Sequence, residues 1–247
     1  MVSNASGSDR GLTGADALAA ALSHRYAGRD GAELLQPIIT EHFPGRIALV
    51  SSFGTESALL LAMAAEIDPA LPVLFLDTGK HFGATLRYRD QLIARLGLGN
   101  VRSLKPEPEA IAALDPQGML WRDDPDACCH ARKVLPLQRG LARYDAWVTG
   151  RKRYQGGLRG ELPIIEADDG RLKINPLATW DRDRIEAELA RRGMPRHPLE
   201  NDGFLSIGCM PCTARATEAD RRAGRWAGTG KTECGIHRPA AVTAAPA

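Results

Sequence analysis

Short apolar runs alternate with longer amphipathic segments along most of the chain. Four runs have the length and apolar character of buried strands: residues 46–51, 72–77, 101–104 and 146–150. Three segments are the clearest helix candidates: residues 58–67, the amphipathic stretch after Asp77, and residues 181–192, which have an acidic N-cap and arginines at the C-terminal end. Because strands that alternate with helices form a parallel sheet covered on both faces, the pattern predicts an α/β fold.

Shorter segments complete the predicted organisation. Residues 15–23, 32–42 and 109–114 are predicted helices, and Pro37 should kink or shorten the second of them. Residues 162–166 and 173–175 are short strand candidates. We expect three regions: an N-terminal extension (1–30), an α/β domain (31–205) and a C-terminal segment (206–247), of which the tail 239–247 should be mobile.

Glycine-bearing loops follow three of the predicted strands, at Ser51, Asp77 and Thr149. The carboxyl ends of parallel strands form the ligand crevice of such sheets, so these loops should meet at one site. The first loop, SSFGTES (residues 51–57), lies between a strand and a helix, which is the layout of a phosphate-binding turn. Serine and threonine cap many helices, so an ordinary N-cap is an equally good interpretation.

The composition limits the class of protein. The chain has 247 residues, of which 44% are hydrophobic and 25% charged, as in ordinary globular domains. A net charge of +2 predicts no general attraction to nucleic acid or membranes, and no apolar run approaches the ~20 residues of a membrane span. We find no signal peptide, and five cysteines cannot all pair, so we expect a cytoplasmic protein with reduced thiols.

Four of the five cysteines form two pairs, Cys128 with Cys129 and Cys209 with Cys212. Four soft ligands in two pairs suggest a metal centre. Zinc is one candidate, but adjacent side chains diverge, which suits the separated irons of a [4Fe–4S] cluster better than one tetrahedral ion. Two other interpretations stay open: Cys128 and Cys129 as small buried hydrophobes, and Cys209 and Cys212 as a redox pair.

Cys234 stands apart in a basic, glycine-rich segment. Lys231 and His237 are each three residues away, and Arg222 and Arg225 lie upstream. Cations favour the thiolate, which is the nucleophilic form, although a surface thiol in a solvated basic segment is the alternative. Further cations follow the strands or flank the first cysteine pair: Lys80, Arg132, Lys133, Arg151, Lys152, Arg153 and Arg159. Together they predict thiolate attack on an oxyanionic substrate.

These motifs carry a family resemblance. SSFGTES, LDTGKHF with YRDQL, CCHARKVLPL, TGRKRYQGGLR, KINPL, GCMPCT, GRW and KTECGIH occur in the order found in iron–sulfur-type adenylyl-sulfate (APS) reductases. Those enzymes belong to the phosphoadenylyl-sulfate (PAPS) reductase family, and the resemblance covers about residues 47–237. It implies a Rossmann-like, adenine nucleotide α-hydrolase-type parallel sheet with helices on both faces, whose modified phosphate loop is residues 51–57.

The resemblance also implies a role for each candidate site residue. Cys234 would be the nucleophile, and the four paired cysteines, Cys128, Cys129, Cys209 and Cys212, would ligate [4Fe–4S]. The nucleotide pocket would be lined by Ser51, Ser52, Phe53, Gly54 and Ser57, with Leu76 and Asp77 near the adenosine and Gly150 beside it. The phosphosulfate would be held by Lys133, Arg159, Arg222 and Arg225, with His237 close by.

The implied activity is reduction of APS to sulfite and AMP in sulfate assimilation and cysteine biosynthesis. Reduced thioredoxin would be the partner that donates electrons, through an S-sulfocysteine intermediate at Cys234, and relatives are often homo-oligomers. Three alternatives stay open: a PAPS reductase with the same mechanism, an ATP pyrophosphatase-type enzyme, and a zinc-binding interaction domain. Four cysteines favour APS, whereas the basic character of TGRKRYQGGLR leaves the preference at the 3′ position open.

Overall fold

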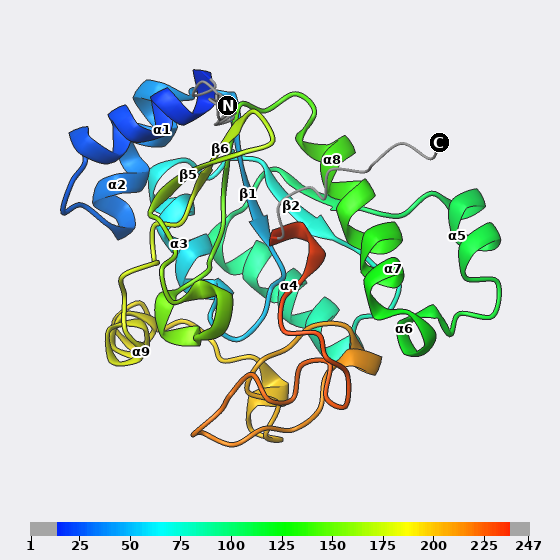
Figure 1. Ribbon diagram of the computed structural model, residues 1–247. Helices are drawn as coiled ribbons and strands as arrows, with labels where there is room; N and C mark the ends of the chain where they lie inside the picture. The colour runs from blue at the N-terminus through cyan, green and yellow to red at the C-terminus, as the bar shows by residue number, and fades with distance from the viewer. Residues whose placement is uncertain (1–13, 238–247) are drawn as a thin grey trace, which may run out of the picture.

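The computed structural model describes residues 14–237, so the predicted mobile tail lies outside the described residues. A six-stranded sheet with the order β3-β2-β1-β4-β6-β5 forms the centre of the molecule (Figure 1). Its strands are β1 (Ile47–Ser51), β2 (Val73–Leu76), β3 (Val101–Leu104), β4 (Ala146–Val148), β5 (Ile165–Asp168) and β6 (Arg171–Ile174). All six lie at or within two residues of the predicted runs, which confirms the α/β architecture.

Contrary to the prediction from the sequence pattern, the sheet is not parallel throughout, because its edge strand β5 runs in the opposite direction. β5 runs antiparallel to β6, whereas the other strand pairs of the described sheet are parallel. Only Asp169 and Gly170 connect β5 to β6, and both have positive φ, at 52° and 76°. A two-residue turn of this kind closes a hairpin, because a parallel connection needs a crossover of a dozen or more residues.

Helices cover both faces of the sheet. Residues that alternate along the strands divide between two apolar clusters, as the period of two requires. On one face, Ile47 and Leu49 join a large cluster, while Ala48 and Trp147 on the other face pack with α8. The first face is covered by α1 (Gly14–Arg25), α2 (Gly31–Pro37), α3 (Ser57–Ile67), α4 (Gly83–Leu96) and α9 (Arg182–Arg191).

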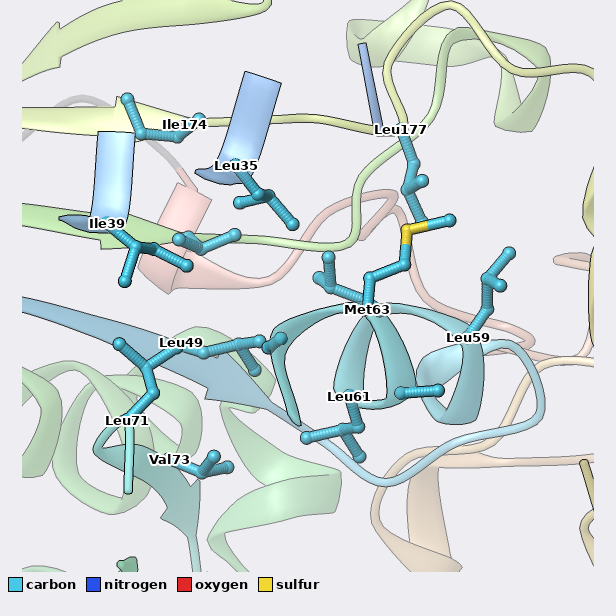
Figure 2. Packing of buried hydrophobic residues seen from close by; sticks show 14 of the residues in the cluster. Leu35, Ile39, Leu49, Leu59, Leu61, Met63, Leu71, Val73, Ile174 and Leu177 are labelled. Atoms are coloured by element: carbon cyan, nitrogen blue, oxygen red, sulfur yellow. The ribbon is translucent and has the colours of Figure 1, made fainter. Parts of the chain in front are cut away.

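The larger cluster forms around α3, whose residues from Ala58 to Ala64 are all buried. Figure 2 shows Leu59, Leu61 and Met63 of this helix in one cluster with Leu35 of α2, Leu49 of β1 and Ile174 of β6. An α-helix that is apolar on every side needs neighbours on every side, and α3 has them in α2, α4 and α9. The loop that precedes α3 is therefore attached to the most rigidly packed element of the fold.

Pro37 divides the second predicted helix. The α-helical part ends at Pro37, and a π-helical turn, η1 (Ile38–His42), continues from it. Proline has no backbone donor, so the regular hydrogen-bond pattern changes at this position. The predicted interruption at Pro37 is confirmed.

The segment between β3 and β4 holds helices that the sequence pattern does not reveal. The predicted helix α5 (Pro108–Leu114) is present, and three more elements and a π-helical turn follow it: α6 (Leu120–Asp123), α7 (Pro125–Cys129), η2 (His130–Val134) and α8 (Leu135–Leu141). Asp124 caps α7 by accepting hydrogen bonds from the backbone N–H groups of Asp126 and Ala127. These helices are too short to show the periodicity of an amphipathic face.

The rest of the chain after β4 consists mainly of short turns around α9. They are η3 (Arg153–Gln155), η4 (Gly157–Arg159), η5 (Pro198–Glu200), η6 (Met210–Cys212) and η7 (Gly235–His237). η7 packs against η2, which brings the end of the described chain onto the α8 face of the sheet. Among residues 14–237, we find no helix with both the length and the apolar character needed to cross a bilayer.

Candidate functional site

A cavity of about 440 Å³ lies at the carboxyl ends of β1, β2 and β4, and Ser51, Leu76 and Thr149 line it. β1 lies between β2 and β4 in the sheet. The connections therefore leave β1 in opposite directions, and this arrangement opens a crevice at the strand ends. The three glycine-bearing loops meet here, as predicted from the order of strands and helices.

The loop after β1 is closed by its own serines. Ser51 Oγ accepts a hydrogen bond from the Phe53 N–H at 3.1 Å, and Ser57 Oγ accepts one from the Gly54 N–H at 3.0 Å. Phe53 has a positive φ of 50°, which turns the backbone sharply before α3. These bonds give the loop a defined shape at the wall of the cavity.

Most of the residues predicted to bind the nucleotide line this cavity: Ser51, Ser52, Gly54, Ser57, Leu76 and Gly150. Two others lie elsewhere. Phe53 is completely buried and packs edge-on against Phe75, with ring centroids 5.6 Å apart. Asp77 lines a second, shallower cavity, where Lys105 lies 3.9 Å from its carboxylate.

Cys234 lies buried in the wall of the main cavity, although its sequence context also allowed an exposed thiol. A hydrogen bond from the Cys129 thiol lowers the pKa of Cys234 well below its usual value, against the effect of burial, and the nearby Lys133 and Arg225 lower it further. The same hydrogen bond raises the pKa of Cys129. Cys234 is therefore the thiolate of the pair and the stronger nucleophile.

Four predicted anion-binding cations surround Cys234 in the lining of the cavity: Lys133, Arg159, Arg222 and Arg225. Burial acts to lower the pKa of Lys133, but the thiolates near it outweigh burial and raise that pKa. Burial together with Arg159 lowers the pKa of Arg222 to about 10, so this guanidinium is still charged at neutral pH. The region around the thiolate is strongly positive and largely closed to water.

The position of Arg225 depends on a glycine. A Cβ atom on Gly208 would lie 2.3 Å from Arg225 Nη2, which is a severe overlap. Arg225 Nη1 donates to the Ile207 carbonyl at 3.3 Å, and its guanidinium lies 4.4 Å from the ring centroid of Trp226. Within the described residues, its Nε has no hydrogen-bond partner. Arg225 thus retains a donor that a bound anion could use.

His237 is held by the ring of Trp147 on β4. Its ring stacks on Trp147 at a centroid distance of 6.1 Å and an angle of 3°, and Lys173 lies 4.7 Å from the same Trp147 ring. Burial and the cations Arg151, Lys173, Arg159 and Arg222 lower the pKa of His237 well below its usual value. His237 is therefore a neutral imidazole, whose Nδ1 has no partner within residues 14–237.

The two cysteine pairs come from segments that pack together. Cys128 and Cys129 end α7, whereas Cys209 forms a bridge to His81 and immediately precedes η6, which ends at Cys212. Burial raises the pKa of Cys128, and charges on Cys209 and Cys212 raise it further, so these three thiols lie within electrostatic range. Cys209 Sγ lies 3.3 Å from Thr78 Oγ1. The fourth thiol, Cys129, is turned towards Cys234.

Four buried or half-buried thiols are the kind of donor set that iron–sulfur clusters use. The cations around them, Arg132, Lys133 and Arg225, would offset the charge of bound thiolates. As the side chains stand, no three His, Cys, Asp or Glu residues within 14–237 converge with the spacing of a metal-ion site. The kind of donor fits a cluster, whereas the present placement of these side chains does not by itself outline a metal site.

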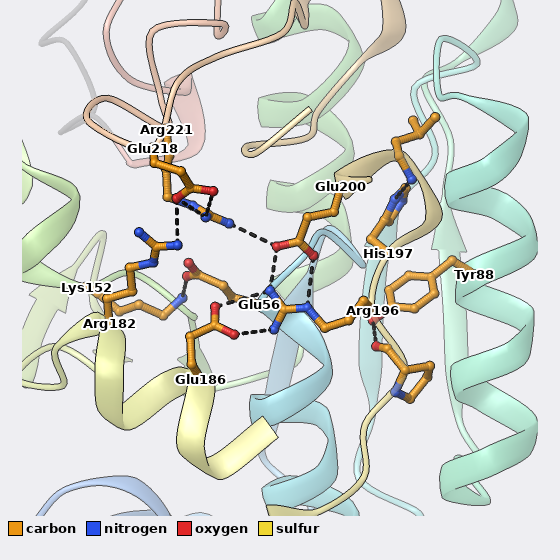
Figure 3. A network of polar contacts seen from close by, with 12 residues as sticks. Glu56, Tyr88, Lys152, Arg182, Glu186, Arg196, His197, Glu200, Glu218 and Arg221 are labelled. Carbon is orange, nitrogen blue, oxygen red and sulfur yellow. Dashed lines mark hydrogen bonds and ion pairs between the residues drawn. The ribbon is translucent and has the colours of Figure 1, made fainter. Parts of the chain in front are cut away.

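A network of ion pairs on the other side of the cavity, buried at Glu56 and exposed at Glu218, was not predicted (Figure 3). Glu56, just before α3, pairs with Lys152 at 2.5 Å and accepts a hydrogen bond from the Tyr154 hydroxyl at 2.5 Å. These contacts lower the pKa of Glu56 to about 2, although burial alone would raise it. Arg182 at the start of α9 pairs with Glu218 at 2.6 Å. In sequence these charges are far apart and resemble solvated surface residues.

Comparison with known proteins identifies the family. Residues 46–215 match the phosphoadenosine phosphosulfate reductase domain. The chain belongs to this family. Over 225 residues it is 50% identical to the adenosine 5'-phosphosulfate reductase of Mesorhizobium japonicum, and the match covers 91% of this chain and 89% of the relative. It is also 41% identical over 201 residues to the phosphoadenosine 5'-phosphosulfate reductase of Gloeobacter violaceus, covering 79% and 83%.

Solved structures agree with the family assignment. The phosphate complex of a PAPS reductase from Candida auris superposes with a TM-score of 0.66 and 25% identity, over 79% of this chain and 96% of that one. The yeast FAD synthetase complex with FAD is similar in fold alone, with a TM-score of 0.53 and 17% identity over 83% of this chain and 76% of that one. The predicted family and the nucleotide-binding α/β fold of the phosphosulfate reductase family are confirmed.

Proposed function

We propose that the protein is an adenosine 5'-phosphosulfate reductase, an oxidoreductase that acts on sulfur in sulfate assimilation. The names of its relatives in Mesorhizobium japonicum and Chelativorans support the substrate, and both are 48% to 50% identical to this chain. The observation that carries the proposal is the buried Cys234 side chain in the wall of a cavity that is also lined by Lys133 and several arginines. This arrangement suits nucleophilic attack on an activated sulfate.

In the proposed reaction, Cys234 Sγ attacks the sulfur of the sulfo group of APS. A bond forms between the two sulfur atoms, and the bond from that sulfur to the phosphate oxygen breaks with both electrons going to AMP. A thiolate of reduced thioredoxin then attacks Cys234 Sγ, and sulfite leaves with the electron pair. The second thioredoxin thiol attacks the resulting mixed disulfide, which releases oxidised thioredoxin and restores the Cys234 thiolate.

The residues around Cys234 supply the electrostatic part of this chemistry. Negative charge moves onto the phosphate of AMP as it leaves, and Lys133, Arg222 and Arg225 line the cavity where it would develop. The neutral ring of His237 can donate or accept one hydrogen bond without adding a charge. Burial in the wall excludes water, which keeps the thiolate reactive towards the bound sulfate.

We further propose that Cys128, Cys129, Cys209 and Cys212 hold a [4Fe–4S] cluster. Cys129 would then bind iron as a thiolate and no longer donate to Cys234, so Lys133, Arg225 and the Ile236 N–H would be the groups that lower the pKa of Cys234. When bound, the cluster and its thiolate ligands would place negative charge at a fixed position beside the cationic side chains of the cavity. The cysteine segments are directly connected to the cationic ones. The Trp226 N–H, next to Arg225, donates to the Cys212 carbonyl at 3.1 Å, and Lys133 lies four residues after Cys129. Thiol ligation would therefore fix the segments that carry Lys133 and Arg225.

The proposed partner is reduced thioredoxin, and a reaction that depends on free thiols fits the cytoplasm. Cys234 is buried, so the η7 turn must open before thioredoxin can reach it. The second candidate substrate is PAPS, which the name of the Gloeobacter relative indicates. The ratio of kcat/KM for APS and PAPS, measured under the same conditions, decides between the two substrates.

The proposal is tested by anaerobic turnover of APS with reduced thioredoxin. We expect the wild-type protein to release sulfite and AMP in equal amounts, and Cys234→Ser to release neither while it keeps its visible iron–sulfur absorbance. Cys209→Ser should lose that absorbance. Sulfite production by Cys234→Ser at the wild-type rate would show that another group performs the attack.

A further inference from the structure

The guanidinium of Arg159 lines the cavity, and each of its three nitrogens already donates a hydrogen bond within the protein. Nε and Nη2 donate to the two carboxylate oxygens of Glu233 at 2.5 and 2.8 Å, and Nη1 donates to Gln155. The two charged side chains are only 10% and 6% exposed. A bidentate pair of this kind uses the edge of the guanidinium that a phosphate or sulfate would otherwise bind.

Glu233 lies where an anionic ligand would lie. Its Oε1 is 3.8 Å from Arg222 Nη2, so the carboxylate is placed between Arg159 and Arg222. Two hydrogen bonds from Arg159 help to lower the pKa of Glu233 to about 2, against the effect of burial. It is therefore a carboxylate at any working pH. Under the proposed function, both arginines are needed for the phosphosulfate.

The same carboxylate also holds the nucleophile. Glu233 Oε1 accepts a hydrogen bond from the Cys234 N–H at 2.9 Å, and Glu233 directly precedes Cys234 in the chain. The Cys234 carbonyl in turn accepts from the His237 N–H at 3.0 Å, which closes the η7 turn. A shift of Glu233 away from Arg159 would therefore break its hydrogen bond to the Cys234 N–H and free the backbone at Cys234.

We propose that Glu233 is a positioning residue that fills the anion site of the empty enzyme and gives up Arg159 to the phosphosulfate of the arriving nucleotide. This inference rests on the proposed function, because it requires an anionic nucleotide in the cavity. Two anions cannot share one edge of Arg159, and a buried carboxylate without its partner is costly. The release of Glu233 therefore frees the backbone at Cys234 from its acceptor, which couples nucleotide binding to the placement of the nucleophile.

The test measures APS binding in the Cys234→Ser protein, where no turnover occurs, with the chain otherwise complete and its metal content checked. Glu233→Gln keeps the size of the side chain but weakens its hold on Arg159. We expect it to lower the Kd of APS about fivefold or more, the lower end of coupling between linked sites. Glu186→Gln is the matched control, since Glu186 pairs with Arg196 outside this cavity, and should leave Kd unchanged.

A second measurement does not depend on how Glu233→Gln folds. In the Cys234→Ser protein, APS should increase hydrogen exchange at the backbone N–H of residue 234, because its acceptor moves away. A merely structural role of Glu233 would give weaker APS binding in Glu233→Gln and greater protection of residue 234 on binding.

The outcomes separate the two levels of the proposal. If APS does not bind to the Cys234→Ser protein, the proposed function is wrong, and so is the proposed displacement of Glu233 from Arg159. If APS binds, but Glu233→Gln has the same or a higher Kd, only the proposed displacement of Glu233 is wrong. Tighter binding in Glu233→Gln together with faster exchange at residue 234 supports it.

Discussion

Removal of the Lys152 charge is the perturbation whose size can be worked out most directly from the structure. Lys152 is 4% exposed and lies 2.5 Å from Glu56, which is 10% exposed and precedes α3. Lys152→Met keeps the length of the side chain but leaves Glu56 as a buried carboxylate without its cation. Burial, opposed now only by the hydrogen bonds from Tyr154 and Gln155 and by the charge of Arg221, then raises the pKa of Glu56.

The magnitude follows from the pKa of Glu56. A decrease from 4.5 to about 2 corresponds to ~3 kcal/mol of stabilisation of the charged form. In the wild-type protein this contribution is complete above pH 4.5 and is lost as the pH falls towards about 2. Lys152→Met loses it at neutral pH and adds the cost of an unpaired buried charge. We therefore expect a loss of about 3–5 kcal/mol in the free energy of unfolding.

Urea unfolding followed by circular dichroism at about pH 8 and about pH 5 measures this effect. The deficit should be smaller at the lower pH, because Glu56 with its raised pKa takes up a proton on folding. The double variant Glu56→Gln/Lys152→Met should recover most of the lost stability. Lys105→Met is the control, because Lys105 is 73% exposed beside Asp77 and should contribute less than about 1 kcal/mol. A deficit below about 1 kcal/mol for Lys152→Met, or one that does not depend on pH, would refute the reasoning.

Three further predictions concern the cavity wall. Alkylation of Cys234 by iodoacetamide should rise less steeply between about pH 7 and 9 than that of a free thiol, because its pKa is lowered, and Lys133→Met should steepen the rise. A rise in the wild type as steep as that of a free thiol would contradict the lowered pKa. Trp147→Leu should lower kcat about tenfold or more, because His237 loses the ring on which it stacks. Trp147→Phe should recover part of the activity. An unchanged kcat in Trp147→Leu would rule out the stacking role. Gly208→Ala should raise the KM of APS, because the added Cβ displaces Arg225. Gly230→Ala is the control and should leave KM unchanged, because a Cβ there meets no atom within 4 Å. Equal KM values for the two variants would contradict the dependence on Gly208.

The sequence predicts the parts of the fold that repeat a simple pattern. Runs such as residues 46–51 become strands because they are short, apolar and followed by glycine-bearing loops. The antiparallel edge strand was missed, although Asp169 and Gly170 carry a recognisable hairpin signal. The helices from Leu120 to Leu141 were missed because each is too short for its period to be visible.

The candidate site could be predicted only in part. The paired cysteines and the basic C-terminal segment indicate their own chemistry, because the residue types are rare and closely spaced. Contacts that join distant segments carry no such signal: Glu56 and Lys152 are 96 residues apart, and Glu233 and Arg159 are 74 apart. For the same reason, nothing in the sequence shows that Phe53 and Asp77 lie away from the cavity that the neighbouring residues line. The division into residues 1–30, 31–205 and 206–247 stays a prediction, as does homo-oligomer formation.

The central claim is that the Cys234 thiolate takes the sulfo group from APS. The direct measurement is mass spectrometry of the anaerobic protein after incubation with APS and without thioredoxin. We predict one added sulfo group on the peptide that contains Cys234, together with an equal amount of AMP, and its loss as sulfite when reduced thioredoxin is added. An unmodified Cys234 in protein that binds APS, or a sulfo group on any other residue, would contradict the account.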